Sequence, residues 1–268
     1  MAYTNIDDPS AHFQTTLYTG NGAAQDITNT GNSDLQPDMV MTKIRNAAQG
    51  WHTISDSTRG VSANTGKWWN VGTTQAELDD ANGIRAFNTD GFKTGNGWFN
   101  GASSYLYVAW QWKCNGGTTT SKSSATVSGN VTTPCVQQVN TDAGFSILTY
   151  TASTSYAGTE THLEHGLGVG PRFLIVKRRD SSADWAVYHA ENGASPSAGY
   201  GYLVLNSTAA TATSSTYWLN TNAESNATLL AFGNNTSVGA DGGEYVCYAF
   251  AEKQGYSKFS KYVGNGVG

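Results

Sequence analysis

The side chains with the most obvious capacity for chemistry lie in the sequence HLEH, residues 162–165. Two imidazoles and a carboxylate are ligands that zinc accepts in proteins. Their spacing is one residue too short for the H-x-x-E-H motif and lacks the four-residue spacing of H-E-x-x-H. The sequence that follows, GLGVGP, also forbids the helix that both motifs need. We therefore predict a polar turn before a strand at Phe173, capped by His165, and no metal site.

No other motif indicates catalysis. The GLGVG sequence at 166–170 precedes a strand, whereas a phosphate-binding loop follows a strand and opens a helix. G-x-S-x-G does not occur, and the neighbouring acids Asp79 and Asp80 lie in loop-like sequence, where solvated carboxylates are the simpler interpretation. The sequences NTDG at 88–91 and ADGGE at 240–244 fit ordinary turns better than calcium sites. The sequence thus predicts no catalytic residue, no metal and no cofactor.

Two aromatic segments could bind sugars, because flat rings stack on pyranose faces. They are GKWWN at 66–70 and GWFNG at 97–101, and glycines flank both as they would in exposed turns. The alternative interpretation, which we favour, is that these rings pack into a neighbouring domain or subunit. The candidate glycan-binding residues are Trp68, Trp69, Trp98 and Phe99.

The three cysteines are Cys114, Cys135 and Cys247, an odd number. Cys114 and Cys135 bracket a segment rich in Thr, Ser and Gly, so a disulfide that closes this loop is a candidate. Two unrelated thiols are the alternative. The first ten residues have neither a basic nor an apolar stretch, so we expect no signal peptide and no signal-dependent secretion.

The composition indicates which elements carry these side chains. Only 13% of the 268 residues are charged, whereas 38% are hydrophobic and aromatic residues are abundant. Gly, Ser, Thr and Asn replace the missing charges, a mix typical of short strands and turns in β-sandwiches. The net charge of −5 argues against nucleic-acid or anionic-membrane partners, and no apolar run reaches 18 residues. We predict an all-β, jelly-roll-like fold.

Internal similarity predicts two tandem units of this kind. PDMVMTKIRNAAQGWHTI from Pro37 resembles PRFLIVKRRDSSADWAVY from Pro171. YVAWQWK at 107–113 resembles YVCYAFAE at 245–252, with a separation of 138 residues, and the tyrosines 18 and 150 are 132 apart. Paired basic residues near a Trp in each unit suggest cation–π contacts. The matches at a separation of 134 are Pro37 with Pro171, Lys43 with Lys177, Arg45 with Arg179 and Trp51 with Trp185.

Alternation of apolar residues marks the strands. In YLYVAWQWK, Leu106, Val108, Trp110 and Trp112 share one face, which we predict to be buried. The continuous apolar run at 173–177 predicts a strand covered on both faces. The single helical indication is TQAELDDA at 74–81, where a threonine and a glutamate could form a capping box.

The predicted organisation has four parts. Residues 1–114 form the first β-sandwich unit, 115–135 a linker or surface loop, 136–256 the second unit, and 257–268 a terminal strand. This last segment repeats the opening of the chain, since KYVGNG at 261–266 resembles LYTGNG at 17–22. Its apolar side chains would pack on the second unit or add to the sheet of a neighbouring subunit. They are, with the residue just before it, Tyr256, Phe259 and Tyr262.

Five sequences together carry a resemblance to a family. NIDDPSAHFQTTLYTGNG, PDMVMTKIRN, YVAWQWKCNGG, HGLGVGPRFLIVKRRDSSADWAVYH and YVCYAFAEKQGYSKFSKYVGNG resemble a repeated domain of marine bacteriophage proteins, especially those of cyanophages. The resemblance covers Asn5 to Gly266 and implies a tail-fibre-like or other virion structural protein without enzymatic activity. It implies location in the virion, synthesis in the host cytoplasm, release by lysis, and self-association or binding to other virion proteins. The main alternative is a carbohydrate-binding adhesin that contacts host surface glycans, and a depolymerase is a distant third.

Overall fold

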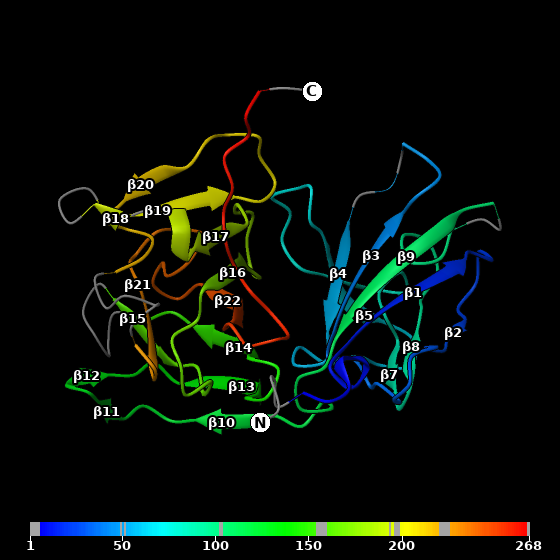
Figure 1. Ribbon diagram of the computed structural model, residues 1–268, viewed down its shortest axis with the longest axis horizontal. Coiled ribbons are helices and arrows are strands. Elements are labelled where there is room, and N and C mark those ends of the chain that lie inside the picture. Colours follow the sequence, from blue (N-terminus) through cyan, green and yellow to red (C-terminus); the bar gives the residue numbers. More distant parts are fainter. Residues whose placement is uncertain are drawn as a thin grey trace.

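A computed structural model describes residues 6–48, 50, 52–101, 104–153, 160–192, 194–195, 199–219 and 226–266. It confirms the predicted all-β class. Within these residues the helical segments are two short 3-10 turns, η1 (Pro9–Ala11) and η2 (Ala190–Asn192). No helix in the described part of the chain has the length and apolar character needed to cross a bilayer. Figure 1 shows two groups of strands, which we call the first unit (β1 to β9) and the second unit (β10 to β22).

The first unit is a sandwich of a six-stranded and a three-stranded antiparallel sheet. Side chains such as Val40 and Ala109 of the large sheet meet Ile27 and Phe92 of the small one, which excludes water from the space between them. The large sheet has the order β1 (Phe13–Thr19), β9 (Leu106–Trp112), β3 (Met39–Ile44), β4 (Thr53–Asp56), β5 (Gly66–Asn70) and β6 (Leu78–Asp80). The small sheet has the order β2 (Asp26–Ile27), β8 (Gly91–Lys93) and β7 (Ala86–Asn88).

The second unit has a nine-stranded sheet and a two-stranded sheet that share a core. Leu148 and Val176 of the large sheet pack against Leu163 and Leu230 of the small one. The large sheet has the order β10 (Thr120–Lys122), β13 (Cys135–Asn140), β14 (Phe145–Thr151), β22 (Glu244–Phe250), β16 (Phe173–Arg178), β17 (Ala186–His189), β19 (Gly199–Val204) and β18 (Ala194–Ser195), with β20 (Ala212–Ser214) paired to β19. The small sheet pairs β15 (Thr161–Glu164) with β21 (Leu229–Phe232), and β11 (Thr126–Val127) and β12 (Asn130–Val131) form a separate hairpin.

The two large sheets have the same strand order and the same register. The order β1-β9-β3-β4-β5-β6 in the first unit corresponds to β14-β22-β16-β17-β19-β20 in the second. Phe13 pairs with Trp112 as Phe145 pairs with Phe250, and both pairs lie at the predicted separations of 132 and 138 residues. Pro37 and Pro171 each lie two residues before the corresponding strands β3 and β16. This correspondence supports our proposal of an internal repeat; Trp51, one of the residues that suggested it, lies outside the described residues.

Several local predictions are wrong. The alternation in β9 is as expected, but Tyr107, Ala109 and Gln111 are the buried residues, whereas Trp110 and Trp112 are only partly covered. The sequence TQAELDDA forms no helix, since its second half is the edge strand β6. A helix there would leave the adjacent strand β5 without its outer partner.

The predicted linker and terminal strand also differ from expectation. Residues 120–122 of the linker form β10, which extends the sheet of the second unit by pairing with β13. Residues 258–266 form no strand, and the preceding residues instead make a turn closed by a bridge between Lys253 and Ser257. Figure 1 shows this terminal segment in red, leaving the middle of the molecule along the second unit.

Candidate functional site: the interface between the two units

The two large sheets pack face to face through corresponding positions. Met39 and Phe173 share this core, as do Ile54 and Val187, and each pair occupies the same place in its own sheet. Further corresponding pairs in the core are Met41 with Ile175, Trp112 with Phe250 and Trp69 with Leu203. One type of apolar sheet face therefore buries a second copy of itself, as a self-complementary dimer interface would.

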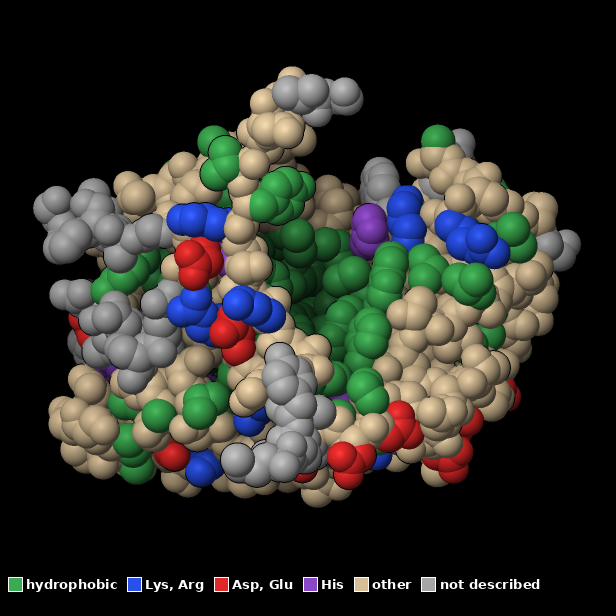
Figure 2. Space-filling view, viewed as in Figure 1, with side chains coloured by type: hydrophobic (Ala, Val, Ile, Leu, Met, Phe, Trp, Pro, Cys, Tyr) green, Lys and Arg blue, Asp and Glu red, His purple; other side chains and the backbone are tan. Residues whose placement is uncertain are grey.

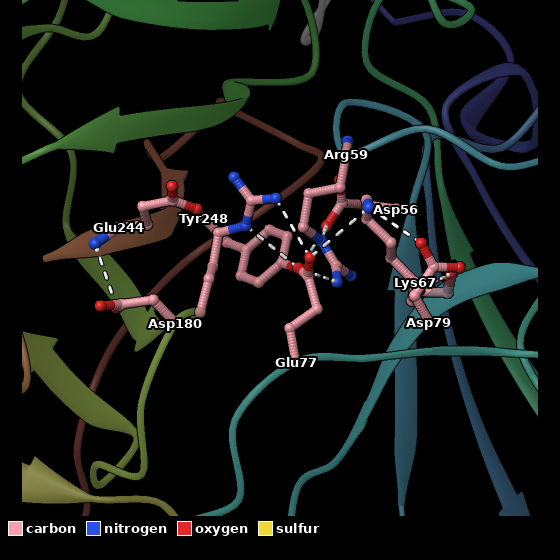
Figure 3. Close-up of polar contacts among 10 residues, drawn as sticks. Asp56, Arg59, Lys67, Glu77, Asp79, Asp180, Glu244 and Tyr248 are labelled. Atoms are coloured by element: carbon pink, nitrogen blue, oxygen red, sulfur yellow. Dashed lines mark hydrogen bonds and ion pairs between the residues drawn. The ribbon is translucent and has the colours of Figure 1, made fainter.

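A buried polar network crosses this apolar interface (Figure 3). Arg59 binds Asp56 with 2.5 Å between Nε and Oδ2, and its Nη1 lies 2.9 Å from Oε2 of Glu77. Arg179 of the second unit binds the same glutamate through two bonds, with Nε–Oε2 of 3.0 Å and Nη2–Oε1 of 3.1 Å. Tyr248 of β22 donates to Oδ2 of Asp56 at 2.6 Å. The network therefore joins the units through two separate charge-assisted contacts.

The electrostatics of the network favour structure over catalysis. Burial acts to raise the pKa of Glu77, but Arg59 and Arg179 outweigh it and hold this pKa below its usual value. Burial raises the pKa of Tyr248 well above the usual value, so the phenol stays protonated and can donate to Asp56. A glutamate engaged by two arginines is a poor general base, because its charge and lone pairs are already committed.

The segment between β5 and β6 leaves the first unit and covers the second. Thr74 O accepts from Lys177 Nζ at 2.9 Å and from Ala183 N at 2.9 Å. Trp185 Nε1 donates to Thr73 O at 3.2 Å. We call residues 71–77 the crossing segment. It provides backbone acceptors that the buried lysine and tryptophan of the second unit require.

Lys177 is the buried cation of this contact. Its side chain also donates to Ala183 O at 2.6 Å and lies 5.7 Å from the centre of the Trp185 ring, which confirms the cation–π contact predicted for the second unit. Burial lowers the pKa of Lys177 to about 8. The two carbonyl acceptors thus compensate a desolvated ammonium group.

An apolar groove opens where the two sheets separate. We call it the inter-unit groove; it has a volume of about 310 Å³. Figure 2 shows hydrophobic side chains lining a hollow beside the C-terminal segment. Its walls include Phe13 and Trp112 from the first unit and Phe145, Phe173 and Phe250 from the second.

The C-terminal segment covers one side of this groove. The ring of Phe259 stacks on Phe173 with 5.6 Å between centroids and 9° between planes. Tyr256 contacts His12 edge to face, and burial raises its pKa to about 12. These two residues of the predicted assembly strand therefore pack against their own chain. Tyr262 is 94% exposed, and its contact with another subunit stays a prediction.

The upper part of the first sheet remains uncovered. Leu17, Val108 and Lys43 occupy adjacent positions on β1, β9 and β3, and Leu17 is 60% exposed. Val108 and Lys43 are partly exposed, whereas their counterparts in the second unit, Val246 and Lys177, are fully buried. We call the uncovered surface of Leu17, Lys43, Val108 and Trp110 the open face.

Burial rules out three of the four candidate glycan-binding rings. Trp68, Trp69 and Phe99 are 3%, 1% and 0% exposed, so no sugar can stack on them. The glycine before the two tryptophans does not mark an exposed turn; Gly66 lies in β5, where a Cβ would come within 1.9 Å of Ile84 O. Trp98 is 48% exposed, and it borders a hollow of about 310 Å³.

The histidines and cysteines have structural environments. His165 is buried, and its Nδ1 accepts from Leu167 N at 3.2 Å, which confirms that it caps the turn. His162, in contrast, belongs to strand β15, so the polar turn begins later than predicted. Nowhere in the described part of the chain do three His, Cys, Asp or Glu side chains converge in a way that would hold a metal ion.

The candidate disulfide is wrong. Cys114 and Cys135 are both free and buried, because their thiols lie in different cores. The thiol of Cys114 points to Phe145 O at 3.4 Å between the two large sheets, whereas Cys135 packs inside the second unit. Burial raises the pKa of Cys135 to about 12, which disfavours the reactive thiolate.

Sequence reasoning missed the residues that join the units. Asp56, Arg59 and Glu77 carry no recognisable motif, and Glu77 was assigned to a helix cap. The useful signal was scarcity: with 13% charged residues, an arginine next to a strand that ends in aspartate is a candidate for burial. The partner Arg179, 102 residues away, has no local signal.

Comparison with known proteins gives one match. The family described as a domain of unknown function (DUF7483) matches residues 8–268, which include both units and the C-terminal segment. No curated protein and no solved structure matches the chain.

Proposed function

The chain belongs to the DUF7483 family, and we propose that it is a non-enzymatic structural subunit of a bacteriophage virion. In this proposal the protein is a component of a tail fibre, another appendage or the capsid surface. It binds copies of itself and other virion proteins, and it needs no cofactor. The assignment to a virion rests on the sequence resemblance described above.

The observation that carries the assembly part of the proposal is the open face. An uncovered apolar area next to the inter-unit groove is typical of a protein-binding surface. The corresponding area of the second unit is covered by the crossing segment, so this type of sheet face is suited to protein contacts. The buried carboxylates Asp56 and Glu77 are engaged by arginines, which is consistent with a structural role.

Labelling of particles tests the virion assignment. Antibodies against the purified chain should label intact particles in electron micrographs, and the chain should sediment with purified particles after a high-salt wash. Preimmune antibodies and a non-virion host protein serve as controls. A chain found only in the soluble fraction of the lysate would contradict the assignment.

A matched pair of surface substitutions tests self-association. Leu17→Lys places a charge on the open face, whereas Val131→Lys changes an exposed residue of the β11–β12 hairpin. We expect the first to shift the sedimentation of the purified protein towards monomer and the second to leave it unchanged. Equal sedimentation of both variants and the parent chain would show that the open face is not an assembly surface.

A second candidate function is glycan binding by an adhesin. The exposed Trp98 favours it, because the indole lies beside a hollow that is also lined by Tyr105, Gly97 and Gly101. Aromatic stacking over small residues is a suitable surface for a pyranose ring. Binding on a glycan array that is lost in Trp98→Ala but kept in Leu17→Lys would support this function.

A further inference from the structure

The crossing segment has a counterpart in the second unit. Hairpin β5–β6 pairs Gly66 with Asp80 and Trp68 with Leu78, and hairpin β19–β20 pairs Tyr200 with Ser214 and Tyr202 with Ala212. All four positions are related by 134 residues, so residues 205–211 correspond one to one to residues 71–77. The sequences are LNSTAAT and VGTTQAE.

The two segments begin with the same backbone contacts. Val71 N donates to His52 O at 2.8 Å, and Leu205 N donates to Trp185 O at 3.0 Å. The following turn is also shared, since Thr73 N donates to Asn70 O and Ser207 N donates to Val204 O. The counterpart segment therefore leaves its sheet in the same way as the crossing segment.

The environments of the two segments differ. Val71 is 6% exposed in the core between the units, whereas its counterpart Leu205 is 43% exposed. Residues 207–211 are exposed, whereas Thr73 and Thr74 accept hydrogen bonds from the second unit. The second unit thus presents a segment of the same shape with no surface to bind within its own chain.

The surface that receives the crossing segment also has a counterpart. In the second unit it includes Lys177, Arg179 and Ser182, which contact Thr74 and Glu77. The corresponding residues of the first unit are Lys43, Arg45 and Ala48, at the border of the open face. Lys43 already donates to Gly50 O, as Lys177 does to Ala183 O, but no described contact supplies the second acceptor that Thr74 gives to Lys177.

We propose that copies of this chain join head to tail, with residues 205–211 of one copy binding the open face of the next. The occupant of the open face is thus a second copy of the chain. This inference rests on the assembly part of the proposed function and names its contact. Lys43 would donate to the carbonyl of Thr208, as Lys177 donates to that of Thr74. Leu205 would approach the apolar side chains of Val108 and Trp110.

Such a contact propagates, because it uses two different surfaces. Each copy offers one segment and one open face, so the contact forms a filament unless its rotation closes a ring. It should be weaker than the contact inside the chain, since Thr211 replaces Glu77 and cannot bind an arginine through a carboxylate. The internal contact also has the advantage of covalent linkage between the units.

A cysteine pair placed on the two surfaces tests the contact directly. Thr74 Oγ1 and Ser182 Oγ are 3.0 Å apart within the chain, and the corresponding positions are 208 and 48. Ala48→Cys with Thr208→Cys should give a ladder of disulfide-linked multimers under mild oxidation, dispersed by reductant. Thr74→Cys with Ser182→Cys is the matched control and should give only an internally bridged monomer. The natural cysteines are buried and should stay unreactive in the folded protein.

Single variants make the test specific. Ala48→Cys alone and Thr208→Cys alone can form only one bridge per chain, so neither should give a ladder, and their mixture should give a mixed dimer. An internal bridge between positions 48 and 208 would overturn the proposal, because the segment would then bind its own first unit. So would multimers of the parent chain in sedimentation without cross-linking of the double variant; in that case assembly stands and this contact is wrong. A ladder combined with failure to label virions would keep the contact and contradict the virion assignment.

Discussion

Trp69 of the first unit and Trp185 of the second meet edge to face, with 5.4 Å between ring centroids and 78° between planes. Both side chains are almost fully buried, and each lies near a cation. The guanidinium of Arg59 lies 3.8 Å from the centre of the Trp69 ring, and Lys177 lies near Trp185. The pair therefore sits at the centre of the contact that joins the two units.

Removal of either ring should destabilise the whole chain. Trp185→Ala and Trp69→Ala should each lower the free energy of unfolding by about 3–5 kcal/mol, because each leaves a cavity between the sheets. The double variant should lose less than the sum, since the edge-to-face contact is counted twice. Chemical denaturation measures these values. Trp98→Ala is the control and should change stability by less than about 0.5 kcal/mol; additive losses would show that the rings are not coupled.

The ion pairs of the network should differ sharply in value. Glu77→Gln leaves two arginines without their carboxylate, and we expect a loss of about 3–5 kcal/mol. Asp79→Asn removes only the half-exposed partner of Lys67, which is 3.0 Å away, and should cost less than about 1 kcal/mol. Denaturant midpoints of the two variants give the comparison. Similar losses would contradict the assignment of Glu77 as the link between the units.

Sequence patterns predicted the strands better than their surroundings. The bounds of β9 and β22 follow from alternation, and β16 is covered on both faces as its apolar run indicates. The buried face of β9 was assigned wrongly because both of its faces meet other layers, one within the unit and one between units. Periodicity cannot distinguish these two kinds of cover.

Glycines and charges gave the other errors, for a similar reason. Gly66 permits a close approach to Ile84 O, whereas Gly97, with φ of 67°, does occupy a turn. Both look alike in sequence, so buried Trp68 and exposed Trp98 received the same interpretation. The partners of Glu77 lie 18 and 102 residues away, a relation that only the packing of the two sheets creates.

Stability at mildly acidic pH should depend on His165. Burial lowers the pKa of this imidazole to about 4 from its usual 6.5, so between these values the unfolded chain binds a proton that the native chain does not. The resulting stability is complete above pH 6.5 and is lost as the pH falls towards 4, by about 3 kcal/mol. His165→Asn keeps an acceptor for Leu167 N but does not titrate. Unfolding free energies between pH 7 and 4 should therefore fall less steeply for the variant; parallel curves would contradict the role of His165.

The lysines 43 and 177 offer a test in which the same substitution has two different results. Lys177→Met leaves Thr74 O and Ala183 O without their buried donor, which should cost about 1–3 kcal/mol of stability. Lys43→Met, at the corresponding position of the first unit, changes a partly exposed group and should shift stability by less than about 0.5 kcal/mol. If the open face binds a neighbouring copy as we propose, Lys43→Met should nevertheless reduce the sedimentation of assemblies at equal protein concentration. Lys113→Met, elsewhere on the first unit, controls for the loss of one positive charge. Unchanged assembly in Lys43→Met would remove this lysine from the contact, and a large loss of stability would show that its environment resembles that of Lys177 within the chain itself.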